Sequence, residues 1–175
     1  CVIRENAEFT FGSPHLLYSY YTRPDKLKEM ADHMVAVFPD LQLLTGGCGE
    51  GSDHLIPAEY ALETGDWKTA ELNALKAVYK ANARKQTCIV LCADFALMRL
   101  YIYQGRISEA LELLSRLRNE VTKENHAVNN TTLEIIEGYI NACLGRAEYI
   151  PAWLRNGDMS PARFIYQGHA FNYIV

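Results

Sequence analysis

Several sequence patterns that would assign a function directly are missing from this chain. It has no run of about 18 apolar residues and no signal-peptide pattern, so no segment is predicted to cross a membrane. It also lacks HExxH, GxxxxGK(S/T) and CxxC, the usual marks of zinc hydrolases, phosphate-binding loops and zinc or redox sites. No nucleophile has a base at a recognisable spacing. We therefore expect no catalytic residue, no metal site and no cofactor.

Neither sign of charge dominates the composition. Lys and Arg number 17 against 21 Asp and Glu, which gives a net charge of −4 at pH 7. Without a cluster of cations we expect this chain to make no direct contact with nucleic acid. Apolar residues make up 49% of the 175 residues, which is ordinary for a globular chain and enough to build the core of one domain.

The most informative stretch runs from Ala58 to Lys80 and reads AEYALETGDWKTAELNALKAVYK. Small residues recur in it at spacings of three and four, which places them on one face of a helix. They are Ala58, Ala61, Ala70, Ala74 and Ala77. Gly65 suits the left-handed residue that ends one helix, and Asp66 suits the N-cap of the next. The stretch therefore predicts two antiparallel helices joined by a tight turn.

The same pattern recurs with a period of forty residues. Gly105 follows Gly65 by forty residues, and Gly145 follows Gly105 by forty, each with apolar or small residues at matching positions on both sides. One step earlier the register reaches Asp25. A hairpin with one apolar face cannot bury that face alone, so successive hairpins are expected to stack.

We expect an all-α fold, a right-handed array of helical hairpins forming a single domain over 1–175. The four pairs are predicted at about 13–45, 52–85, 87–124 and 128–157, after a lead-in at 1–12 and before a truncated helix at 160–175.

Local signals refine these limits. Pro39 is expected to end a helix that starts at Asp25, and Ser52 is expected to cap the next helix. The polar tract 123–131 is predicted to be a loop, and Pro151 is expected to keep the last helix short.

The pattern GDWxxAxxxAxxA resembles the tetratricopeptide repeat, whose usual period is about 34 residues. The segments FTFGSPHLLYSYY (Phe9–Tyr21) and AEYALETGDWKTAELNALKAVYKA (Ala58–Ala81) resemble, more closely, the repeat region of MalT-like regulators of the LuxR family. That resemblance implies a cytoplasmic, bacterial sensor and protein-interaction domain. It would couple binding of an inducer or a protein partner to an ATPase domain and a helix-turn-helix DNA-binding domain elsewhere in the parent chain.

Both ends of the sequence resemble cuts in a longer chain, because Cys1 stands in place of Met and the last apolar residues have no helix cap. We expect a fragment. The alternative is a generic tetratricopeptide-like scaffold for protein–protein interaction, including a lipoprotein anchored through Cys1. The sequence leaves the oligomeric state open.

Four other features have ordinary structural explanations that we favour. The glycine-rich segment TGGCGEGS before a helix could bind an anion, but a connecting loop explains its glycines equally well. Glu29 and His33 could share a metal, but a solvated helix face is favoured. Trp67 is expected in the core rather than in a ligand cage. Cys88 and Cys92 are expected to be reduced core thiols.

The resemblance places a binding groove on the first helix of each pair. The residues it assigns to the exposed face of that groove are His15, Ser19, Arg23, Glu59, Glu63, Arg99, Tyr103, Tyr139 and Cys143. The preferred contact patch is Arg99 with Tyr103 and Tyr139, since Arg and Tyr are enriched at recognition surfaces. For Glu59 and Glu63 we favour ion pairs between adjacent helices that support the stack.

Overall fold

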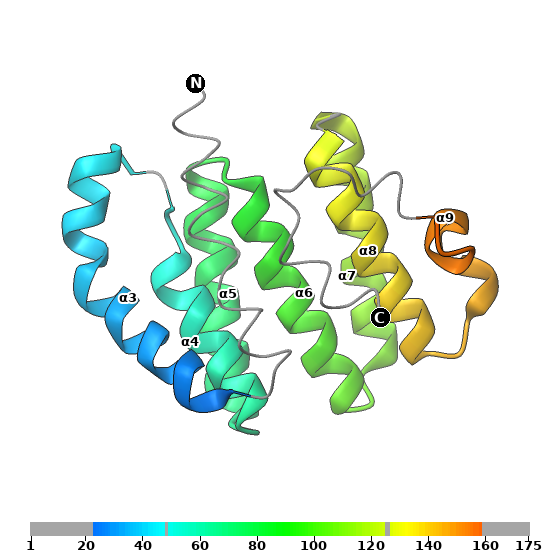
Figure 1. Cartoon of the computed structure of the whole chain (residues 1–175), viewed down its shortest axis with the longest axis horizontal. Coiled ribbons are helices and arrows are strands. Elements are labelled where there is room, and N and C mark those ends of the chain that lie inside the picture. Colours follow the sequence, from blue (N-terminus) through cyan, green and yellow to red (C-terminus); the bar gives the residue numbers. More distant parts are fainter. Residues whose placement is uncertain (1–22, 48, 125–126, 159–175) are drawn as a thin grey trace.

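The computed structural model describes residues 23–47, 49–124 and 127–158, and throughout these ranges the chain forms helices and no strands (Figure 1). The all-α class is thereby confirmed. The α-helices are α3 (Pro24–Thr45), α4 (Ser52–Glu63), α5 (Trp67–Ala83), α6 (Thr87–Tyr103), α7 (Ile107–Glu124), α8 (Ala127–Cys143) and α9 (Ala152–Arg155). A short 3₁₀ helix, η1 (Ala147–Tyr149), lies between α8 and α9. The predicted segments 1–12, 13–22 and 160–175 fall outside the described residues.

The three glycines of the forty-residue period occupy equivalent turns. Gly65, Gly105 and Gly145 have φ of 80°, 74° and 67°, the left-handed conformation that glycine adopts without strain. After each glycine, the next backbone N–H donates to the carbonyl five residues earlier, at 2.9, 2.8 and 2.8 Å. This closure satisfies a helix-end carbonyl in the same way three times, so the predicted equivalence of these three turns is confirmed. The earlier step of the register was wrong, because Asp25 lies inside the first turn of α3 and not in a matching turn.

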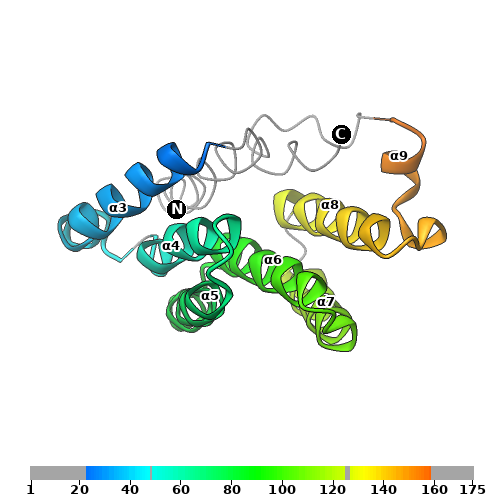
Figure 2. The same ribbon diagram turned by 90° about the horizontal axis from the view of Figure 1, so that it is seen from below.

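Helix α6 is the centre of the packing and contacts α4, α5, α7 and α8. Every residue from Cys88 to Leu100 is buried. An apolar run that is covered all round in this way forms a helix in this chain, as its length predicted. Ala70 and Ala110 are buried, as expected for close approach of helices. Figure 2 shows α5 and α7 on one side of the row formed by α4, α6 and α8.

Two predicted helix limits were wrong. Helix α3 does not end before Pro39 but continues to Thr45 with the proline inside it. The side of α3 at Pro39 is exposed, so water can satisfy the carbonyl that loses its hydrogen bond. The described residues of the tract 123–131 are helical rather than a loop, because α7 extends to Glu124 and α8 begins at Ala127. Burial of Thr131, although it is polar, shows that packing overrides the local loop signal.

Two predicted side-chain roles were also wrong. Gly51, not Ser52, is the N-cap of α4, and Ser52 is a fully buried residue of the first turn. Trp67 is 43% exposed rather than in the core. It is the first residue of α5, directly after the turn at Gly65, and its neighbours Lys68 and Thr69 are exposed as well. No described helix covers the side chains at this end of the hairpin.

The last hairpin is short, as Pro151 predicted. Helix α9 has only four residues and packs back on α8. Gly138 makes this contact close, because a Cβ there would lie 2.5 Å from Cδ1 of Leu154. The indole N–H of Trp153 donates to a carboxylate oxygen of Glu134 at 2.7 Å. None of the described helices combines the length and apolar character needed to cross a membrane.

Candidate functional site

The predicted groove face contains a buried ion-pair cluster. The guanidinium of Arg99 on α6 donates to the carboxylate of Glu59 on α4, and its second nitrogen lies 3.3 Å from the carboxylate of Glu63. Arg99 is 2% exposed and Glu59 is 0% exposed. Removing a charged group from water is costly unless a group of opposite charge lies beside it. The Arg99–Glu59 pair therefore requires α6 and α4 to stay in contact at this point.

Aromatic contacts extend the cluster to α8. The Arg99 guanidinium carbon lies 4.9 Å from the centre of the Phe95 ring. The Phe95 ring in turn meets the ring of Tyr139 edge-on, with 5.3 Å between centroids. Burial raises the pKa of Tyr139, and it also raises the pKa of Glu63 against the opposing influence of Arg99. The first helices of three successive hairpins are thus joined through side chains on one face.

These positions correct part of the predicted groove. Glu59 and Arg99 are not exposed contact residues, because they neutralise each other between α4 and α6. Pairing of Arg99 with Glu59 and Glu63 between adjacent helices is confirmed. Tyr103 remains exposed and Tyr139 is half-buried, so these tyrosines are the parts of the preferred patch that can reach a ligand.

The outer members of the predicted groove divide into three cases. Arg23 precedes α3 and forms an exposed ion pair with Asp25 at 2.8 Å. Cys143 is an exposed free thiol at the end of α8. His15 and Ser19 lie outside the described residues.

The glycine-rich loop is tied to the fold by a buried glutamine. The Gly49 N–H donates to Oε1 of Gln86 at 2.7 Å, and Nε2 of Gln86 donates to the carbonyl of Gly47 at 2.7 Å. Gly51 packs so closely that a Cβ would lie 2.7 Å from the carbonyl oxygen of Ala77. Close packing and these hydrogen bonds explain the glycines of this loop.

The other candidate groups also have structural partners. Glu29 and Asp32 pair with Lys26 and Lys28 on the exposed face of α3. Cys88 and Cys92 are buried free thiols, as expected. The hydrogen bond with Cys88 and burial raise the pKa of Cys92 well above its ordinary value, which disfavours a thiolate nucleophile.

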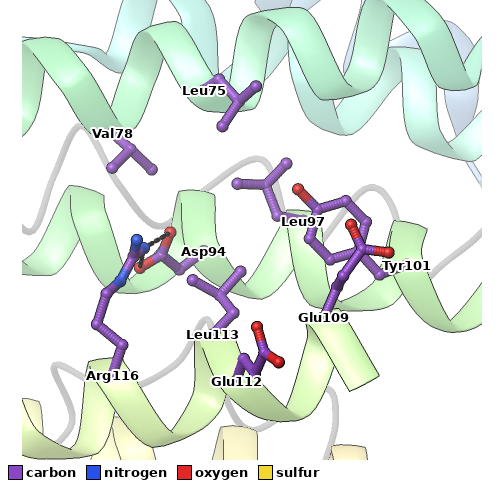
Figure 3. Close-up of a pocket in the computed structure, with 9 residues that line it drawn as sticks. All are labelled: Leu75, Val78, Asp94, Leu97, Tyr101, Glu109, Glu112, Leu113 and Arg116. Carbon is purple, nitrogen blue, oxygen red and sulfur yellow. Dashed lines mark hydrogen bonds and ion pairs between the residues drawn. The ribbon is translucent and has the colours of Figure 1, made fainter. Parts of the chain in front are cut away.

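A pocket that was not predicted from the sequence lies between α5 and α7, on the side of α6 away from α8. Its volume is about 350 Å³, and its lining side chains come from three helices (Figure 3). They are Leu75 and Val78 of α5, Asp94, Leu97 and Tyr101 of α6, and Glu109, Glu112, Leu113 and Arg116 of α7. The leucines and the valine form apolar walls, and the charged groups gather around them.

One charged group of this pocket is fully buried. Asp94 is 0% exposed, and its carboxylate lies 3.2 Å from a guanidinium nitrogen of Arg116, whose side chain is half exposed. Burial raises the pKa of Asp94 to about 6, and the nearby Arg116 charge opposes that rise. A carboxyl group with a pKa in this range changes charge under mildly acidic conditions.

A sequence signal could have located both clusters. Asp94 and Arg99 are the charged residues within the apolar run CIVLCADFALMRL of α6. A charge in the middle of a helix that is buried on all sides must have a partner of opposite sign. The partners are Arg116 and Glu59, and only the packing of α6 against α7 and α4 identifies them.

Comparisons with protein-family models, curated proteins and solved structures yield no match to this chain.

Proposed function

We propose that this chain is the sensing and protein-interaction repeat region of a MalT-like regulator of the LuxR family. In this proposal the hairpins form a right-handed, tetratricopeptide-like superhelix within a longer cytoplasmic protein. Binding of an inducer or a protein partner to the face shared by α4, α6 and α8 changes the state of the ATPase and DNA-binding domains of the parent chain.

The observation that carries the proposal is the contact between successive hairpins on that face. Glu59 of α4, Arg99 and Phe95 of α6, and Tyr139 of α8 form one chain of contacts. A ligand that displaces one first helix therefore disturbs its neighbours, which is what a sensor domain requires. The resemblance of segments 9–21 and 58–81 supports the specific family.

The test replaces the two tyrosines that the structure leaves accessible. In the parent regulator, the double variant Tyr103→Ala/Tyr139→Phe removes a ring and a hydroxyl without breaking the buried ion pairs of Arg99. The matched control is Tyr149→Ala, which removes an exposed ring from η1 instead. We expect the double variant to keep its helical circular-dichroism spectrum and to lose its transcriptional response, while the control keeps both.

A folded double variant with an unchanged response would exclude this face as the sensor. The coding sequence on either side of this segment, in the gene of the parent chain, provides a separate test of the family. The proposal requires a GxxxxGK(S/T) motif upstream and a helix-turn-helix segment downstream. If neither is encoded there, the chain is a general interaction scaffold and not part of such a regulator.

A further inference from the structure

The pocket between α5 and α7 has an acidic rim that its own cation does not balance. Three carboxylates line it, from Asp94, Glu109 and Glu112, against the single guanidinium of Arg116. Arg106 does not line the pocket, but its guanidinium forms an ion pair with the carboxylate of Glu109 at 2.6 Å. Glu112 is exposed and forms no ion pair with any residue that the structure describes. The pocket therefore attracts a positive charge from outside the chain.

The walls of the same pocket fit the aliphatic part of such a cation. Leu75 and Val78 face Leu97 and Leu113 across it, as Figure 3 shows. A lysine or arginine side chain combines a charged end with an apolar stem, so it can fill this space while its charge meets the carboxylates. The volume of about 350 Å³ is sufficient for such a group.

An exposed apolar strip adjoins the pocket along α5. Leu72, Leu75 and Tyr79 are spaced by three and four residues and so lie on one helical face. All three are exposed, and Tyr79 is 79% exposed. Because Leu75 belongs both to the strip and to the pocket lining, the pocket and the strip form one continuous surface that a protein segment can cover. Apolar area of this kind next to a charged pocket is typical of a protein-binding surface.

We propose that the groove between α5 and α7 binds a segment of a partner protein. The segment inserts a basic side chain into the pocket and packs neighbouring apolar side chains on the strip of Leu72, Leu75 and Tyr79. A free organic amine would fill the pocket alone and leave the strip uncovered. The complementary charge and the adjoining apolar face therefore favour a peptide. This surface is separate from the face of α4, α6 and α8, so the proposal does not depend on the proposed function.

The experiment uses two defined probes with the intact 175-residue chain, followed by methyl NMR spectra. The first probe is butylguanidinium, which reproduces the arginine end. The second is an alanine-based helical peptide with one arginine and with leucines three and four residues from it. A matched peptide carries neutral citrulline in place of the arginine. We expect both arginine-type probes to shift the methyl signals of Leu75, Leu97 and Leu113 in a saturable way. The arginine peptide should bind more tightly than butylguanidinium.

Two variants separate the pocket from the strip. Glu112→Gln removes an exposed pocket charge and should weaken binding of both probes by about threefold to tenfold. The control Glu148→Gln changes a carboxylate on η1, outside the pocket, and should leave binding unchanged. Leu72 belongs to the strip but not to the pocket lining, so Leu72→Ala should weaken binding of the peptide and leave binding of butylguanidinium unchanged.

Three results would overturn the proposal. Shifts spread over other surfaces would exclude the pocket as the site. Equal binding of the arginine and citrulline peptides would exclude recognition of the charge. If butylguanidinium binds as tightly as the peptide and Leu72→Ala has no effect, the pocket is a site for small amines and not for a partner protein.

Discussion

Arg99 and Glu59 stand forty residues apart, at positions separated by one full period, and are joined as a buried ion pair between α6 and α4. The two residues occupy equivalent positions of neighbouring hairpins, and the packing of α6 against α4 brings their side chains together. Both side chains are buried between α4 and α6, so neither is available to a ligand. The pair is therefore expected to contribute to the stability of the fold rather than to bind a ligand.

Replacing Arg99 by Ala should destabilise the chain by about 3–5 kcal/mol, because it leaves the Glu59 carboxylate buried without its arginine. Arg23→Ala, which removes the exposed partner of Asp25, should change stability far less, because water screens that pair. The measurement is urea unfolding followed by circular dichroism. Similar midpoints for the two variants would show that the Arg99 pair is not energetically distinct from a surface pair.

Replacing Ala110 by Leu should overpack the junction of α7 with α6 and cost roughly 1–3 kcal/mol. Ala110 is fully buried and belongs to the largest apolar cluster of the described core. The control is Ala142→Leu on an exposed position of α8, which should change stability very little. Thermal unfolding compares the two, and equal melting temperatures would contradict close packing at the repeated small residue.

Gly51→Ala should destabilise the chain more than Gly105→Ala. Both glycines have positive φ, so either change costs about 1–2 kcal/mol of backbone strain. At Gly105 a Cβ meets nothing within 4 Å, whereas at Gly51 it would lie 2.7 Å from the backbone oxygen of Ala77. The added overlap should cost roughly a further 1–3 kcal/mol. Denaturant midpoints that place Gly105→Ala lower would contradict this packing.

The buried carboxyl of Asp94 should make stability fall as pH rises. Its pKa in the folded chain is about 6, above the value of about 3.9 for an unfolded chain. Between these two values only the folded state keeps the proton, so the free energy of unfolding decreases from about pH 4 to pH 6, by up to roughly 3 kcal/mol. The stabilisation is complete below the lower pKa and lost above the upper one.

The variant Asp94→Asn isolates this effect, because other carboxyl groups titrate equally in both proteins. The stability difference between the native chain and Asp94→Asn should change over about pH 4 to 6 and stay constant above about pH 7. Arg116→Ala should move the change to higher pH, since Arg116 holds the pKa of Asp94 down. Parallel stability profiles for the native chain and Asp94→Asn would contradict the raised pKa.

Local sequence was sufficient for the helices and their turns. A glycine in the left-handed conformation after an apolar, Ala-rich segment depends on residues within one or two turns, so Gly65, Gly105 and Gly145 could be placed by spacing alone. Burial of Ala70 and Ala110 followed from the same periodicity, because small residues on one helical face permit close approach. These features require no knowledge of which helix packs where.

Only tertiary structure decided which polar residues are buried and where a pocket forms. Arg99 and Asp94 lie in one apolar run, yet their burial depends on Glu59 of α4 and Arg116 of α7, which lie 40 and 22 residues away. Pro39 and Thr131 likewise carry strong local signals that packing and solvent exposure overrule. The cost of removing a charge or a carbonyl from water is set by the neighbours that replace the water. In this chain those neighbours belong to other helices, so periodicity predicts the helical framework and three-dimensional packing determines its chemistry.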